Sequence, residues 1–221
     1  MAKYEAVLFD FDGTICDTFP GISEAMNLML GEIKGESHEL EYYKDCVGPP
    51  LEESFTHKFL IPESELERAV LIFRSFYQNT SVPGSSLYEG MRECLESLKR
   101  AGLRLAVASS KANDMIERIL RHNGLFELFD AVCGLTSEKD HASKTECIER
   151  ALAALGMSGE AERKKALMVG DRFYDAEGAE NAGLDFCAAL YAGYYREGEF
   201  DPYPCAFEAQ SALDIAGFAL G

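Results

Sequence analysis

The chain has 221 residues, 47% of them apolar, which suits one large domain or a core domain with a smaller companion. Its formal charge of −17 and pI near 4.6 argue against nucleic-acid binding, because that affinity comes largely from clustered lysine and arginine. No stretch approaches the roughly 18 apolar residues of a membrane span, and no apolar signal region follows Met1. We therefore expect a soluble cytoplasmic protein that binds neither nucleic acid nor a membrane.

Short apolar runs alternate with helical patterns along most of the chain. Strands buried on both faces are predicted at residues 5–10, 103–109, 131–135, 166–171 and 186–191. Between them, apolar residues at helical spacing predict helices that end near Gly102, Asn123-Gly124 and Gly156. This alternation predicts an α/β fold with a doubly wound parallel sheet.

Residues 16–83 interrupt this rhythm, and we predict no strand there. Apolar residues recur at helical spacing in three segments, Ile22 to Met29, Leu51 to Phe59 and Leu66 to Phe73. Breaks such as Gly48-Pro49-Pro50 separate the segments. The pattern predicts an all-helical domain at 16–83, inserted into an α/β core domain that is formed by residues 1–15 and 84–221.

Seven scattered cysteines form no CxxC pair, so the sequence indicates neither a disulfide framework nor a zinc site. Polar residues instead gather where predicted strands end or adjoining helices begin: Asp10, Asp12, Ser109, Lys111, Lys144, Asp171 and Asp175. Because ligands bind outside the carboxyl ends of the strands in an open parallel sheet, we expect these residues to form one site.

Four carboxylates in one cleft would repel one another unless a cation lay between them. Hard oxygen ligands of this kind suit Mg²⁺, which is commonly shared with a substrate phosphate. The lysines and hydroxyl groups are what a phosphoryl group requires. A metal alone would not call for Lys144, and a phosphate alone would not call for four acids, so the combination favours phosphoryl transfer.

The motifs at these positions resemble those of the haloacid dehalogenase superfamily. Asp10-Phe11-Asp12-Gly13-Thr14 resembles its DxDGT nucleophile motif, and Val107-Ala108-Ser109-Ser110-Lys111 resembles its second motif. Lys144 resembles the third motif, and Val169-Gly170-Asp171-Arg172-Phe173-Tyr174-Asp175 resembles the fourth, of GDxxxD form. The helical insertion is similar to the cap of the phosphoglycolate-phosphatase-like and nucleotidase-like branch. Four motifs in order extend the resemblance over nearly the whole chain.

The resemblance implies a role for each catalytic residue. Asp10 would attack phosphorus and form an aspartyl-phosphate. Asp12 would protonate the leaving oxygen and then take a proton from the attacking water. Ser109 would donate a hydrogen bond to a phosphoryl oxygen, and Lys144 would balance the charge on nucleophile and phosphate.

The resemblance also implies a metal site. Mg²⁺ would be held by the Asp10 carboxylate, the Asp12 backbone carbonyl and Asp171, with Asp175 supporting them. No other cofactor is expected. The helical cap would close over the site and exclude water other than the nucleophile. Lys111 could bind phosphate or lie at the rim of the site, and both roles stay open.

Two details narrow the expected reaction. Within the superfamily a dehalogenase does not need the second acid, so Asp12 favours a phosphatase or a sugar phosphomutase. Arg172 departs from the pattern usual in phosphoglycolate phosphatases, so the leaving group stays open. We expect hydrolysis of a small soluble phosphomonoester by a monomer or weak dimer. A receiver-like protein that carries phosphate on Asp10 as a signal is the alternative from another functional class.

Overall fold

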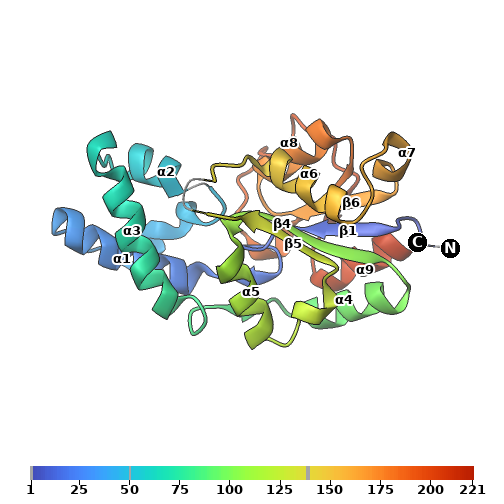
Figure 1. Cartoon of the computed structure of the whole chain (residues 1–221), viewed down its shortest axis with the longest axis horizontal. Coiled ribbons are helices and arrows are strands. Elements are labelled where there is room, and N and C mark those ends of the chain that lie inside the picture. Colours follow the sequence, from blue (N-terminus) through green and yellow to red (C-terminus); the bar gives the residue numbers. More distant parts are fainter. Residues whose placement is uncertain (1, 50, 138–139) are drawn as a thin grey trace. The chain divides into compact units, whose positions relative to one another are not determined.

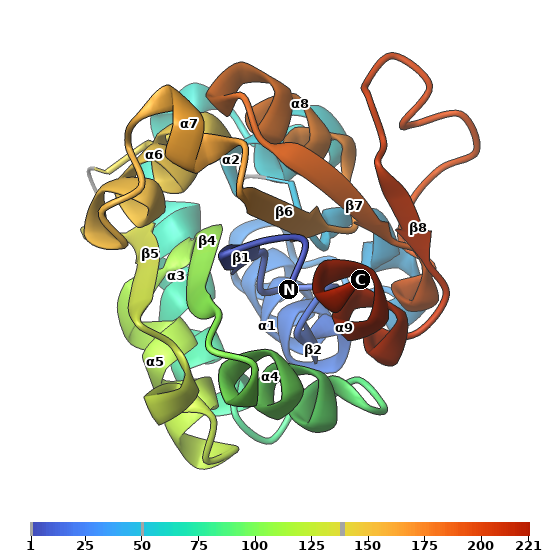
Figure 2. The same ribbon diagram turned by 90° about the vertical axis from the view of Figure 1, so that its right-hand side faces the viewer.

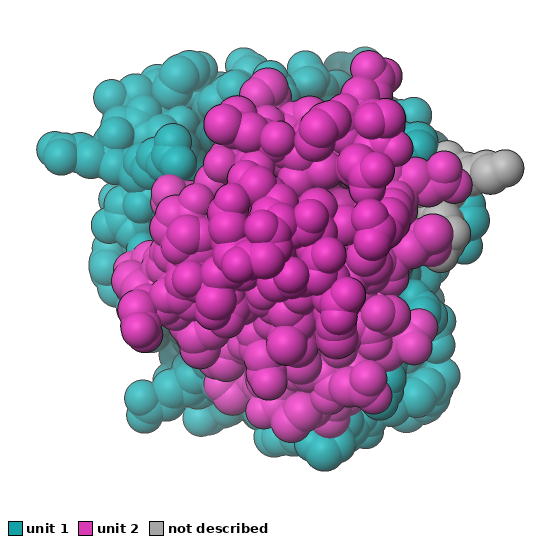
Figure 3. Space-filling model, turned by 90° about the vertical axis from the view of Figure 1, so that its left-hand side faces the viewer, with its two compact units in different colours: residues 1–16, 87–221 teal, residues 17–86 magenta. Residues whose placement is uncertain are grey.

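The structure, a computed structural model, describes residues 2–49, 51–137 and 140–221. Pro50, part of the predicted break Gly48-Pro49-Pro50, lies outside the described residues. The chain divides into two units, one formed by Met1–Cys16 and Leu87–Gly221 and the other by Asp17–Ser86, which Figure 3 colours separately. The assignment of 16–83 as a cap domain stays a prediction.

The first unit is built on a six-stranded parallel sheet with the order β5-β4-β1-β6-β7-β8. Its strands are β1 (Ala6–Phe9), β4 (Arg104–Ala112), β5 (Ala131–Leu135), β6 (Ala166–Gly170), β7 (Asp185–Ala189) and β8 (Phe207–Ala209). The predicted doubly wound α/β fold is confirmed. The central strands β1 and β6 are entirely buried because both faces of the sheet are covered, which explains their uninterrupted apolar sequences.

Helices cover both faces of this sheet, as Figures 1 and 2 show. One face carries α6 (Lys144–Ala154), α7 (Glu160–Arg163) and α8 (Phe173–Ala182); the other carries α4 (Met91–Arg100), α5 (Asn113–His122) and α9 (Ala212–Leu220). Short 3₁₀ turns are η3 (Phe126–Leu128) and η4 (Leu190–Ala192). Ile148 and Leu152 of α6 share one buried cluster with Leu8 and Met168 of the sheet. This packing ties the start of α6 to the central strands.

The register of the central strands brings polar residues that are far apart in the sequence together at the carboxyl end of the sheet. Phe9 at the end of β1 is aligned with Val107 of β4 and Val169 of β6. Asp10 directly follows β1, and Asp171 directly follows β6. Strand order also reverses at β1, since β4 and β5 lie on one side and β6, β7 and β8 on the other. Open α/β sheets bind ligands at such a switch point.

The second unit is helical. It contains α1 (Phe19–Lys34), the 3₁₀ segment η1 (Leu40–Cys46), α2 (Leu51–Glu53), the π-helical segment η2 (Ser54–Lys58) and α3 (Glu63–Thr80). Its core is aromatic: the rings of Phe73 and Tyr77 stack with centroids 5.4 Å apart, and Phe55 lies 6.1 Å from Phe73. Among the described residues, no helix is long and apolar enough to cross a membrane.

Several predicted boundaries were wrong. A short strand, β2 (Cys16–Asp17), lies in the segment predicted to contain none; it pairs with β3 (Ser86–Leu87), and two-residue strands have no sequence period. The strands β3 and β8 and the helix α9 were not predicted. The strand expected at 186–191 ends at Ala189 because a 3₁₀ turn follows.

Two further strands differ from expectation for reasons of sheet position. β5 was predicted to be buried on both faces, but it is an edge strand and most of its residues are partly exposed. β4 extends to Ala112, three residues past its predicted end, because its register with β5 shifts after Ala108 and pairing resumes at Ala112.

Candidate active site

Three acids meet at the carboxyl end of the sheet. Oxygens of Asp10, Asp171 and Asp175 all lie within 4.8 Å of one another, and the residues are only 4%, 0% and 1% exposed. Asp10 follows β1, Asp171 follows β6, and Asp175 lies in the first turn of α8. Three carboxylates so close together and so far from water repel one another unless positive charge lies between them.

Burial and mutual repulsion change the pKa values of two of these acids. Burial, with the neighbouring Asp175 and Asp10, raises the pKa of Asp171 well above its ordinary value. Burial also raises the pKa of Asp175, to about 6, although Lys144 opposes that shift. A cation bound here would favour the ionised form of both groups.

The donor set fits a hard divalent cation. Asp171 Oδ2 is buried and has no hydrogen-bond partner among the described residues, whereas buried polar atoms normally have one. All the clustered donors are carboxylate oxygens, which Mg²⁺ prefers. Asp10, Asp171 and Asp175 are therefore suited to hold the predicted ion.

Lys144 supplies positive charge from the first residue of α6. Its Nζ lies 2.6 Å from Asp10 Oδ1 and 2.8 Å from Asp175 Oδ1, and it donates a hydrogen bond to the Ala108 carbonyl at 3.2 Å. Burial alone would lower the pKa of Lys144, but the Asp10 and Asp175 carboxylates raise it above its ordinary value. The side chain therefore stays an ammonium group that contacts the predicted nucleophile.

The turn after β1 supports Asp171. Gly13 has φ +80°, and a Cβ atom there would lie 2.3 Å from Asp171 Oδ2, so only glycine fits. Thr14 Oγ1 donates to Asp171 Oδ1 at 3.1 Å, and both residues are buried. The Tyr191 hydroxyl donates to the Thr14 carbonyl at 2.6 Å. This turn therefore fixes the position of the Asp171 carboxylate.

The fourth predicted acid, Asp12, has a different partner. Its carboxylate oxygens lie 2.9 and 3.1 Å from Lys111 Nζ, and both side chains are largely buried. Lys111 therefore pairs with the predicted acid–base residue rather than lying at an exposed rim. Ser109 is buried in β4, two residues before Lys111, and its Oγ accepts a hydrogen bond from the Lys111 backbone N–H at 3.3 Å.

Comparison with known proteins agrees with this geometry. Residues 7–189, most of the chain, match the family described as haloacid dehalogenase-like hydrolase. The chain belongs to this family.

Relatives of this chain have names that refer to several activities. It is 34% identical over 181 residues to the tyrosine-protein kinase PtkA of Mycobacterium tuberculosis, covering 82% of this chain but only 60% of PtkA. It is 31% identical to the pyrophosphatase PpaX of Halalkalibacterium halodurans, over 97% of this chain and 98% of PpaX. A crystal structure of a predicted phosphatase from Clostridium acetobutylicum is 28% identical with a TM-score of 0.88, and 97% of each chain is covered. The chain thus spans 60% of the PtkA sequence and nearly all of PpaX.

Arg172, which departs from the pattern usual in phosphoglycolate phosphatases, occupies the N-cap position of α8. Its buried Nε donates to Glu199 Oε1 at 2.9 Å, and the same oxygen accepts the Phe173 backbone N–H at 2.8 Å. Asp175 Oδ2 accepts the Arg172 backbone N–H at 3.1 Å, so the Asp175 side chain helps to cap the start of α8. The Arg172 guanidinium thus binds a loop of the same unit.

Sequence reasoning missed some of the residues that support the site. Thr14 was noted only as part of the first motif, where its place beside two acids was the available signal. Tyr191 and Glu199 have no local signature, because their contacts with Thr14 and Arg172 span 177 and 27 residues. Only folding brings such pairs together.

Proposed function

We propose that this chain is a Mg²⁺-dependent phosphatase that hydrolyses a small soluble phosphomonoester through a phosphoryl group carried on Asp10. The observation that supports this most is the Lys144 ammonium group between Asp10 and Asp175 beside the orphaned Asp171 oxygen. The carboxylates of this arrangement suit a metal cation, and the Lys144 ammonium group suits a phosphate. Mg²⁺, when bound, would neutralise charge on the phosphoryl oxygens.

The residues of the chain would divide the reaction into two steps. An Asp10 carboxylate oxygen would form a bond to phosphorus while the ester P–O bond breaks, and Asp12 would give its proton to the leaving oxygen. Asp12, then a carboxylate, would accept a proton from water as the water oxygen bonds to phosphorus and the aspartyl P–O bond breaks. The products are an alcohol and inorganic phosphate. Lys144 and Ser109 would hold the phosphoryl oxygens throughout.

The Lys111–Asp12 ion pair supports the second step in particular. Two contacts with Lys111 Nζ, at 2.9 and 3.1 Å, fix the direction of the Asp12 carboxyl group, as a general base requires. The first step requires the same carboxyl group to carry a proton. We therefore propose that substrate binding draws Lys111 toward the phosphate and releases Asp12.

The test is phosphate release from a panel of 2-phosphoglycolate, nucleoside 5′-monophosphates, sugar phosphates and pyrophosphate, with Mg²⁺ and with chelator. Asp10→Asn keeps the size of the side chain but removes the nucleophile, so we expect turnover to disappear while the far-UV circular dichroism is unchanged. The control is Asp201→Asn, an exposed acid outside the cluster, which should keep full activity. Turnover by Asp10→Asn, or equal turnover in chelator, would contradict the proposal.

The product also separates the alternatives. Isomerised sugar phosphate without free phosphate would identify the phosphomutase, and a long-lived aspartyl-phosphate would identify the receiver-like protein. The 34% identity with PtkA favours a second candidate, transfer of a phosphoryl group to a tyrosine hydroxyl. Radiolabelled ATP distinguishes it, since a kinase leaves label on protein tyrosine and a phosphatase leaves it on free phosphate. Cytoplasmic location and a monomeric or weakly dimeric state stay predictions.

A further inference from the structure

The ammonium group of Lys144 depends on where its helix begins. Lys144 is the first residue of α6, so its backbone is held on one side by the helix and on the other by the loop before it. Its Nζ must reach Asp10 and Asp175 at once. A loop that shifted would move the first turn of α6 and carry the ammonium group away from both oxygens.

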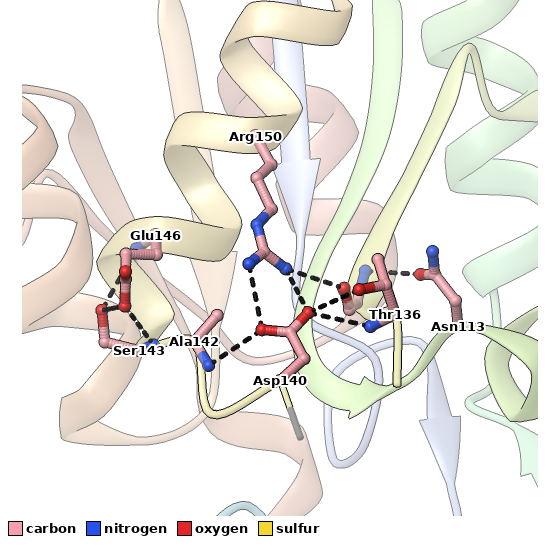
Figure 4. Close-up of polar contacts among 8 residues, drawn as sticks. Asn113, Thr136, Asp140, Ala142, Ser143, Glu146 and Arg150 are labelled. Carbon is pink, nitrogen blue, oxygen red and sulfur yellow. Dashed lines mark hydrogen bonds and ion pairs between the residues drawn. The ribbon is translucent and has the colours of Figure 1, made fainter. Parts of the chain in front are cut away.

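Described residues of that loop, among 136–137 and 140–143, make contacts with one carboxylate, Asp140, as Figure 4 shows. Asp140 Oδ2 accepts the Thr136 backbone N–H and hydroxyl, each at 2.9 Å, and Oδ1 accepts the Ala142 backbone N–H at 3.2 Å. Arg150 completes the arrangement with two parallel contacts, Nη1 to Oδ2 at 2.7 Å and Nη2 to Oδ1 at 3.0 Å. The Arg150 guanidinium, with the Thr136 and Ala142 donors, holds the pKa of Asp140 well below its usual range. The Asp140 carboxylate therefore stays charged, and both of its oxygens accept hydrogen bonds.

The arginine belongs to the helix that it helps to place. Arg150 lies in α6, six residues after Lys144, and reaches back to the loop before the helix. Its Nη1 also lies 3.5 Å from the carbonyl of Gly134 in β5, and the Gly134 N–H donates to Asn113 Oδ1 at 2.5 Å. The Arg150–Asp140 pair is thus connected to the sheet and to the start of α5.

A capping box acts at the same helix start. Ser143 Oγ accepts the Glu146 backbone N–H at 3.2 Å, and Glu146 Oε2 accepts the Ser143 backbone N–H at 2.8 Å. The box satisfies two N–H groups at the helix start, those of Ser143 and Glu146. It leaves the direction of the incoming chain undetermined, and the contacts of Asp140 supply that restraint.

We infer that the Asp140–Arg150 ion pair is a positioning device that holds Lys144 against Asp10 and Asp175. This inference rests on the proposed function for its kinetic consequence, because Lys144 serves that reaction. Among the described residues, the contacts of Asp140 and Arg150 include none with Asp10, Asp171 or Asp175. Both residues therefore act through Lys144. Displacing a catalytic group by about 1 Å can cost roughly a hundredfold in rate.

The first test measures the exposure of Lys144 without any substrate. Brief treatment with acetic anhydride followed by mass spectrometry reports how fast its amine is acetylated. We expect Asp140→Asn and Arg150→Met to increase the rate of Lys144 acetylation at least several-fold. Arg150→Lys keeps the positive charge but loses the two parallel guanidinium contacts, so its effect should be intermediate. The matched control is Glu149→Gln. Glu149 also lies in α6, and its Oε2 accepts from Arg163 Nη2 at 2.7 Å, so this variant removes an arginine ion pair that does not involve the loop before α6.

The second test is a double-mutant cycle on kcat with the best ester from the panel. Asp140→Asn should lower kcat by roughly tenfold or more in the wild-type background. In a Lys144→Met background it should cause no further loss, because the group that it positions is gone.

Three results would overturn the inference: wild-type acetylation of Lys144 in Asp140→Asn and Arg150→Met, an equal increase in Glu149→Gln, or losses of kcat that multiply independently. If the wild-type protein hydrolyses no ester, the proposed function fails, and the acetylation rates alone still decide the positioning role.

Discussion

Magnesium should stabilise this protein at neutral pH and do so less in acid. The physical reason is the acid cluster, where Asp171 and Asp175 bind protons more tightly than ordinary carboxyl groups. A cation must displace those protons to bind. With Mg²⁺ at a hundredfold excess over its Kd, the free energy of unfolding should rise by about 2.7 kcal/mol. For a chain of this size, that raises Tm by about 5–10 °C.

The pH dependence follows from Asp175. Its pKa of about 6 leaves most of the group protonated at pH 5 and little of it at pH 7. Proton competition at this one residue therefore weakens Mg²⁺ binding about tenfold between pH 7 and pH 5. At a fixed Mg²⁺ concentration above the Kd, the stabilisation should fall by about 1.4 kcal/mol. The raised pKa of Asp171 shifts binding in the same direction.

In chelator, where no Mg²⁺ is bound, the Asp175 carboxyl group makes the protein less stable as pH rises. Because the folded protein holds the Asp175 proton more tightly than the unfolded chain, this group stabilises the fold fully below pH 3.8, its ordinary pKa. That contribution is lost as pH rises through about 6. We therefore expect stability in chelator to fall over this range, and stability in Mg²⁺ to fall less or to rise.

The assay is thermal unfolding followed by circular dichroism between pH 4.5 and 7.5, in Mg²⁺ and in chelator, with KCl matching the ionic strength. Asp171→Asn should remove most of the Mg²⁺ effect, and the exposed control Asp201→Asn should keep it. A Tm increase that is as large at pH 5 as at pH 7 would refute the reasoning, as would its full retention in Asp171→Asn.

Two further substitutions test the turn that supports Asp171. Gly13→Ala should destabilise the protein by more than Gly183→Ala in urea unfolding: both glycines have positive φ, which costs an alanine about 1–2 kcal/mol, but only the Gly13 Cβ would meet the carboxylate. Equal losses would show that the Asp171 contact is unimportant. Thr14→Val should cost about 1.5–3 kcal/mol of stability and weaken Mg²⁺ binding measured by calorimetry, because it removes a hydrogen bond to a buried carboxylate. Thr14→Ser should restore most of both, and a valine variant with unchanged stability and affinity would contradict this role.

The central fold was predictable because its signals are local. The apolar runs of β1 and β6 are buried on both faces, and such strands carry no other pattern. The parts that were missed have weak local signals. β8 has three residues and lies at an edge of the sheet, and β2 forms only because β3, which lies beyond residues 18–85, pairs with it.

For the site, the sequence by itself determined which chemical groups follow each strand: Asp10, Asp171 and Lys144 could be named because strand ends and helix starts are local features. Only the tertiary structure decided what surrounds them. It excludes water from Asp171, leaves one of its oxygens without a partner, and brings Lys144 to 2.6 Å from Asp10. The physical reason is that burial and electrostatic coupling depend on packing between segments far apart in the chain, which no local pattern records.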